Sequence, residues 1–199
     1  MGAVETMMID MAYSQVGKHL GLPTHAYMAL SDAKSPDAQA GLESAMGAVL
    51  AALAGINVVS GPGMLDFESC QSLEKLILDH EICGMAHRLT RGIALREKPL
   101  AEHILEKIGR VDHFLTEEHT MKWFKQEAAF PGPAIDRGTL GEWQASGRLN
   151  AAGRARQEVG RILDTTEPKM LPEDIRRELE ALILTDGEKY GLEELPQIH

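Results

Sequence analysis

Two short apolar segments on either side of one helical pattern limit most strongly what this chain can fold into. Thr24–Leu30 and Ile56–Ser60 are apolar runs too short for ordinary helices, and the second is rich in β-branched residues. Between them, apolar residues recur at helical spacing from Ala38 to Leu53, and Gly55 is a suitable residue to end that helix. Strand, helix and strand joined by short loops form the βαβ pattern, which implies parallel strands. The sequence therefore predicts an α/β fold.

Helical patterns surround this unit, so the fold is expected to be rich in helix. One amphipathic pattern covers residues 4–20, and another runs from about Ser69 to Gly92. Further helices are expected at 99–109, from Thr116 onward, and at 139–146, 150–164 and 172–184. "HFL" is a candidate brief strand, and "AFPGPAIDRG" is expected to be a loop.

The stretch "SDAKSPDAQAG" joins the first strand to the central helix. Ser35 is a favourable N-cap residue, and Pro36 suits the first helical position. Asp37 would then lie in the first turn, where the helix dipole favours a carboxylate. Capping accounts for Ser35 and Pro36, and the helix dipole accounts for Asp37.

Composition excludes some classes of partner. The net charge of −10 argues against nucleic acid, because phosphate binding needs a basic face. It is compatible with a cationic small molecule. No apolar run reaches the roughly 18 residues of a membrane span. Cys70 and Cys83 fall in one expected helix and form no CxxC pair, as is typical of a reduced, cytoplasmic protein that binds no metal through them.

Several long motifs resemble the trimethylamine methyltransferase family. They are "SDAKSPDAQAG", "AALAGINVVSGPGML", "EKLILDHEICGM" and "HFLTEEHT". The resemblance implies a (β/α)8 TIM barrel, of which 199 residues can supply only a part. We therefore expect the last βα units of the barrel at 1–130, followed by a C-terminal loop and helical extension at 131–199.

The resemblance also implies a chemistry. Members of the family move a methyl group from a methylated amine to the cobalt of a separate corrinoid protein, so no corrinoid would bind to this chain directly. Some members contain pyrrolysine, and none of the 199 positions here is a nonstandard residue. A quaternary amine, such as glycine betaine, is therefore favoured over trimethylamine. The expected partners are the corrinoid protein, a subunit carrying the rest of the barrel, and further copies of this chain, because an open half-barrel exposes apolar edges.

Two corners of the chain follow the expected strands, where barrel enzymes bind their substrates. Ser31 and Asp32 lie at the first, and Asp32 could either face a cation or accept hydrogen bonds from loop amides. Lys34 beside them is expected to be solvated. At the second corner, Gly61 and Gly63 around Pro62 are expected to form a constrained turn with close backbone approach. The turn could line the cavity or could be a turn alone, and Met64 could pack on a methyl group or in the core. The candidate residues are Gly61, Pro62, Gly63 and Met64.

The "HFLTEEHT" cluster is the third candidate region. By resemblance, His119 is expected to contact substrate, and His113 and Glu117 to face the corrinoid. The spacing is not that of a zinc-binding motif, so no metal site is predicted. Thr116 could instead cap the helix that follows.

Three functions remain open from sequence alone. The chain could be a corrinoid-dependent methyltransferase or one subunit of it. It could be a truncated, inactive relative that serves as an assembly or binding module. It could also be a fragment that depends on dimerisation for stability.

Overall fold

The predicted βαβ unit is present in the computed structural model. Strand β1 (His25–Ala26) and strand β2 (Val58–Val59) pair in parallel, and helix α2 (Ala38–Ala54) connects them. Both strands are shorter than predicted, because only two residues of each hold the ladder geometry. The structure thus confirms the α/β class and the parallel pairing.

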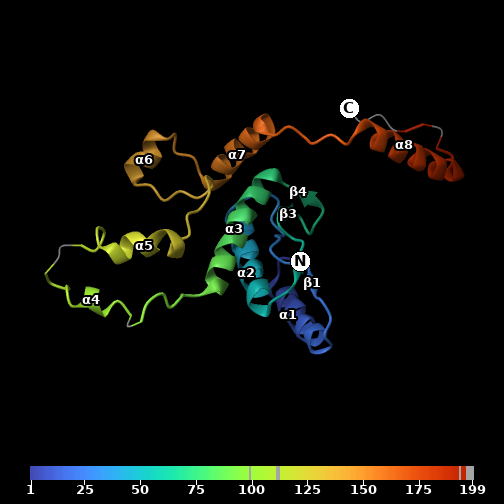
Figure 1. Ribbon diagram of the computed structural model, residues 1–199. Coiled ribbons are helices and arrows are strands. Elements are labelled where there is room, and N and C mark those ends of the chain that lie inside the picture. The colour runs from blue at the N-terminus through green and yellow to red at the C-terminus, as the bar shows by residue number, and fades with distance from the viewer. Residues whose placement is uncertain (99, 111–112, 193, 196–199) are drawn as a thin grey trace. The chain divides into compact units, whose positions relative to one another are not determined.

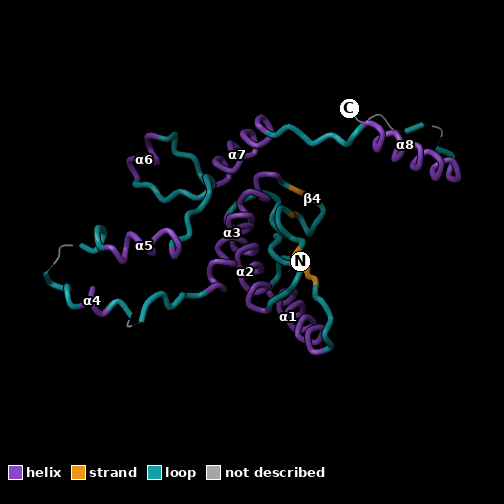
Figure 2. Tube along the Cα trace, viewed as in Figure 1, coloured by secondary structure: helices purple, strands orange, loops and turns teal. Residues whose placement is uncertain are grey.

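The structure describes residues 1–98, 100–110, 113–192 and 194–195. They belong to two compact units, Met1–Leu163 and Asp164–His199. Figure 1 shows the elements in chain order, and Figure 2 shows how much more of the described chain is helix than strand. The predicted boundary between the barrel units at 1–130 and the C-terminal extension at 131–199 stays a prediction.

Helix α2 begins later than predicted. Its N-cap is Asp37, whose carboxylate accepts the N–H groups of Gln39 and Ala40. The prediction that Ser35 caps the helix and Pro36 opens it is wrong, because an aspartate two residues on satisfies the free amides of the first turn. The predicted end is confirmed: Gly55 adopts a left-handed conformation at the C-cap.

Small residues allow the elements of the first unit to approach closely. Helix α1 (Val4–His19) contributes Met7 to a core cluster with Ala26, Met28 and Ala51. Helix α3 (Leu73–Arg91) packs along α2, and a second cluster there joins Ala48 to Ala86. In Figure 1 these two helices lie side by side. A predominance of alanine keeps the interhelical distance short but limits the apolar area buried.

A β-hairpin precedes α3, and its second strand occupies residues that were expected to begin that helix. Strands β3 (Met64–Leu65) and β4 (Cys70–Gln71) pair antiparallel, and Ser72 is the N-cap of α3. The prediction that this helix starts at Ser69 and contains Cys70 is therefore wrong, whereas Cys83 does lie in it. Asp66, Phe67 and Glu68 in the hairpin turn all have positive φ, between 49° and 73°. No glycine marks this turn, so the sequence carried no signal for it.

The remaining helices are shorter. They are α4 (Glu102–Leu105), α5 (Glu118–Glu127), α6 (Leu140–Ala145) and α7 (Ala151–Thr165). Phe114 and Leu115 form no strand, so the "HFL" expectation is wrong. Thr116 is not the cap of α5, because Glu117 occupies that position. The loop predicted at 129–138 is confirmed.

The second unit contains helix α8 (Glu173–Gly187) and a short 3-10 helix, η1 (Glu188–Tyr190).

Over the described residues of the whole chain, no helix is long and apolar enough to cross a membrane. Among the described residues, the strands form one parallel and one antiparallel pair, both in the first unit. They are compatible with a partial domain, and the (β/α)8 barrel stays a prediction.

Candidate functional site

The two predicted corners lie against each other. The Ser31 N–H donates to the Met64 carbonyl at 3.2 Å, and the Asp66 N–H donates to the Ala33 carbonyl at 3.0 Å. These bonds join segments that are about thirty positions apart in the sequence, so the loops that follow β1 and β2 contact each other. We call residues 31–33 and 61–66 together the corner site.

A carboxylate from α2 fixes the first corner. Glu43 Oε2 accepts a 2.6 Å bond from the Ser31 hydroxyl and a 2.8 Å bond from the Asp32 N–H. The Ser31 hydroxyl also accepts the Ala33 N–H at 2.9 Å. Ser31 is fully buried. It therefore shapes the corner from within, whereas Asp32 presents its carboxylate at the surface.

Asp32 is hydrogen-bonded to residues 1 and 2. Its carboxylate accepts the Met1 ammonium at 3.0 Å and the Gly2 N–H at 2.9 Å. Partial burial raises the pKa of Asp32, but the Gly2 N–H bond and the nearby ammonium outweigh it, so the pKa is lower than usual. Lys34 is exposed as predicted, and its ammonium lies 3.4 Å from Asp66 and over the Phe67 ring.

The second corner is a close-packed turn. A Cβ atom on Gly61 would lie only 2.0 Å from the Met28 carbonyl oxygen, so the backbone needs glycine there. Gly63 has φ of +89°, which also favours glycine. Pro62 and Met64 are both half-buried. The expectation of close backbone approach at this turn is confirmed, and a role in substrate binding stays a prediction.

A buried polar network supports this turn from below. Asp79 Oδ2 accepts the Gly63 N–H at 2.6 Å and the Lys75 ammonium at 2.5 Å. Lys75 also donates to the Ser44 hydroxyl at 2.7 Å. The side chains of Lys75 and Asp79 are each only 1% exposed. Burial raises the pKa of Asp79, against the opposing effects of the Gly63 N–H and the Lys75 ammonium.

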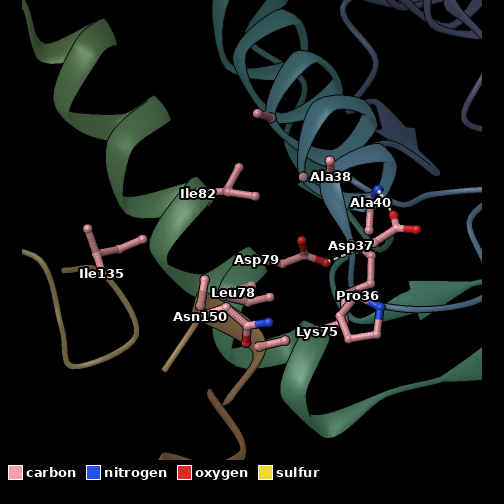
Figure 3. A pocket seen from close by; sticks show the side chains of 14 residues that line it. Pro36, Asp37, Ala38, Ala40, Lys75, Leu78, Asp79, Ile82, Ile135 and Asn150 are labelled. Atoms are coloured by element: carbon pink, nitrogen blue, oxygen red, sulfur yellow. Dashed lines mark hydrogen bonds and ion pairs between the residues drawn. The ribbon is translucent and has the colours of Figure 1, made fainter. Parts of the chain in front are cut away.

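A cavity of about 460 Å³ adjoins this network in the first unit. Figure 3 shows Asp79, Leu78 and Ile82 of α3 facing the first turn of α2. Ile135 and Asn150 complete the wall from the loop and from the start of α7. Most of the lining is apolar, including Pro36, Ala38, Ala40, Ala45, Ala151 and Ala152.

The third candidate region is held by other contacts. Glu117 pairs with Lys107 at 2.5 Å. His119 lies 3.8 Å from the Glu97 carboxylate and edge-on to the His103 ring. His113 is exposed. Within the described residues, no hydrogen bond or ion pair joins this cluster to the corner site, so the structure brings together the first two candidate regions but not the third.

Sequence reasoning missed the residues that hold the corner site. Glu43, Lys75 and Asp79 lie inside helices, and only their direction in the folded chain shows what they bind. Glu81 of α3 accepts the Gly132 N–H at 3.0 Å, which ties the loop after α5 to α3. Groups of three or more His, Cys, Asp or Glu residues placed to hold a metal are absent from the described part of the chain.

Together, the parallel strands, the connecting helix and the polar loops at the carboxyl ends define a protein of α/β type, in the arrangement where such folds bind ligands. The chain belongs to the trimethylamine methyltransferase (MTTB) family, whose sequence model matches residues 1–191.

Curated relatives share this family. The trimethylamine methyltransferase MttB of Methanosarcina thermophila is 33% identical over 182 residues, which are 90% of this chain and 37% of that protein. The glycine betaine methyltransferase of Desulfitobacterium hafniense strain Y51 is 35% identical over 194 residues, 96% of this chain and 40% of that protein. A trimethylamine methyltransferase MttB from another strain of Desulfitobacterium hafniense is 28% identical over 191 residues. The chain therefore spans about two fifths of the length of these relatives.

Proposed function

We propose that this chain forms the amine-facing part of a methyltransferase that transfers a methyl group from a methylated amine to a corrinoid protein. The observation that carries the proposal is the corner site itself. Two loops from a family of amine methyltransferases meet after parallel strands, and Asp32 there carries a partly exposed carboxylate.

A quaternary amine is the proposed substrate class. Its nitrogen carries a positive charge and no lone pair, so a site must hold it by a carboxylate and by apolar contact. Asp32 supplies the carboxylate, and half-buried Met64 supplies a polarizable apolar surface for the methyl groups. Lys34, close to both corners, could bind a carboxylate on the same substrate, as in glycine betaine.

The protein's share of the chemistry is orientation and electrostatics. The corrinoid of the partner protein would supply the nucleophile that attacks the methyl carbon. The amine nitrogen leaves with the electron pair of the broken C–N bond and becomes a neutral tertiary amine. Under this proposal the rigid corner site holds the leaving nitrogen in place, and His113 and Glu117 remain the residues proposed to face the corrinoid protein.

The test is a methyl-transfer assay with cobalt(I) cobalamin. Glycine betaine, tetramethylammonium and trimethylamine are offered to the chain alone and together with proteins encoded beside it. We expect weak transfer or none by the chain alone, and transfer from a quaternary amine once a corrinoid protein and a polypeptide with the rest of the family fold are present. No methyl transfer in any combination would contradict the proposal and favour an inactive binding module.

A further inference from the structure

The buried Lys75–Asp79 pair is poorly explained by stability alone. Both side chains are 1% exposed, and their charged atoms lie 2.5 Å apart. Removing two charges from water offsets most of their mutual attraction, and well-packed apolar residues of similar size are often as stable or more so. The pair therefore calls for a role that apolar residues could not perform.

The contacts of Asp79 show what that role is. Asp79 Oδ2 accepts the backbone N–H of Gly63 at 2.6 Å, in the middle of the second corner. A leucine at this position would leave that amide buried without an acceptor, at a substantial cost. Lys75 in turn holds the carboxylate, and Ser44 on α2 holds Lys75.

The position of Gly63 controls the rest of the corner site. Its φ of +89° aims the N–H inward, and its carbonyl accepts the Ser72 N–H at 3.0 Å. The next residue, Met64, places its carbonyl against the Ser31 N–H of the first corner. One hydrogen-bonded path thus runs from Asp79 through Gly63 and Met64 to Ser31.

From this path we infer that Asp79, held by Lys75, is a positioning residue, which fixes the Gly61–Met64 loop in the conformation that receives the amine. The inference rests on the proposed function for the identity of the ligand. The positioning of the loop rests on the contacts alone, so the two are tested separately.

Two double variants that differ at one position test the positioning. Lys75→Met with Asp79→Leu removes both charges and the acceptor for Gly63. Lys75→Met with Asp79→Asn removes both charges but keeps an amide oxygen as acceptor. Amide hydrogen exchange at Gly63 is measured by NMR, and the unfolding midpoint is measured in urea.

We expect the Leu variant to exchange the Gly63 amide about 10- to 100-fold faster than wild type, because a hydrogen bond to a charged group is lost. Its unfolding midpoint should stay near that of wild type, because removing two buried charges offsets the cost of the unpaired Gly63 amide. The Asn variant should restore most of the protection. Unchanged Gly63 exchange in the Leu variant would overturn the inference. So would faster exchange that merely follows a general loss of stability at all core amides.

Kinetics separate this result from the proposed function. In the methyl-transfer assay, the Leu variant should have a KM for the amine raised at least about tenfold, and the Asn variant a KM close to wild type. An unchanged KM in the Leu variant would overturn the link between loop and amine. Absence of transfer by wild type would contradict the proposed function, while Gly63 exchange would still decide the positioning.

Discussion

Two lysine–carboxylate ion pairs with the same N–O distance lie in different parts of the first unit, one in residues 1–92 and one in residues 93–127. Lys75 and Asp79 lie 2.5 Å apart among residues 1–92 and are each 1% exposed. Lys107 and Glu117 also lie 2.5 Å apart, but within residues 93–127, and are 43% and 19% exposed. At the same distance the electrostatic attraction is stronger in the buried Lys75–Asp79 pair, because water screens the exposed Lys107–Glu117 pair and not the buried one.

The apolar contacts differ in the same way. Buried hydrophobic side chains gather in residues 1–92, with Met28, Leu30 and Leu65 among the largest. In residues 93–127, Ile104 is the buried hydrophobic residue among those described. That region is held instead by partly exposed groups around two carboxylates: Glu97 accepts from Trp123 and Lys122, and Glu127 from Arg88 and Arg96. Residues 1–92 are therefore the rigid scaffold on which the corner site depends.

The largest effect is expected when only one charge of the buried Lys75–Asp79 pair is removed. Lys75→Met leaves Asp79 charged and buried without its cation, and should lower the free energy of unfolding by about 3–5 kcal/mol. The matched control, Lys107→Met, should lower it by less than about 1 kcal/mol. Urea denaturation of both variants measures the two values. Equal losses would contradict the distinction between the regions.

A second prediction tests how closely the scaffold is packed. A Cβ atom on Gly47 would lie 2.6 Å from the Ala29 backbone nitrogen, so Gly47→Ala should cost about 1–3 kcal/mol through overpacking. Gly41 lies on the same helix with no neighbouring atom within 4 Å, and Gly41→Ala should stabilise the protein by about 0.5–1 kcal/mol. Thermal and urea unfolding should give opposite signs for the two. The same sign in both would mean that α2 does not approach the Ala29 backbone this closely.

A third prediction concerns the start of α2. Asp37→Ala removes the N-cap acceptor of two amides and should cost about 1 kcal/mol. Ser35→Ala, at the position that the sequence suggested as the cap, should change the unfolding free energy by less than about 0.5 kcal/mol. Urea unfolding distinguishes the two. A larger loss of stability for Ser35→Ala than for Asp37→Ala would mean that Ser35, not Asp37, is the N-cap of α2.

The smallest effect is a pH-dependent contact at the edge of the scaffold. A hydrogen bond from its own backbone N–H, then bonds from Arg156 and Ser72, hold the pKa of Glu74 below its usual value of 4.5. A carboxyl with a lowered pKa contributes stability above its unfolded pKa, and that contribution is lost as pH falls through the folded value. Arg156→Met should therefore cost less than about 1 kcal/mol at pH 7, and that cost should shrink as pH falls below 4.5. A difference independent of pH would contradict this reading of the Glu74–Arg156 pair.

The contrast between the regions also explains what the sequence could predict. The parallel βαβ unit, the end of α2 at Gly55 and the close approach at Gly61 follow from local residue types and their spacing, and all three were predicted. The hairpin of β3 and β4 was not, because its turn uses three consecutive residues with positive φ and no glycine. The shift of the N-cap from Ser35 to Asp37 arose because both residues are good caps and only the backbone decides between them.

The sequence predicted the loop residues of the candidate site but not the helix residues that hold those loops in place. Ser31, Asp32 and the Gly61–Met64 loop stand out as polar or glycine-rich loops after apolar runs. Glu43 and Asp79 lie in helical patterns that continue through them, and the amides that they accept are 11 and 16 residues away in the sequence. Such contacts depend on how helices pack, which spacing alone does not determine.

An NMR titration of the ¹⁵N-labelled chain with glycine betaine tests most directly whether the two corners form one amine-binding site. We expect saturable shifts of amide signals at both corners, including Asp32, Ala33, Gly63 and Met64, and their loss in an Asp32→Ala variant. Saturable shifts at one corner without the other, or none at either, would contradict the claim that the two corners form one amine-binding site.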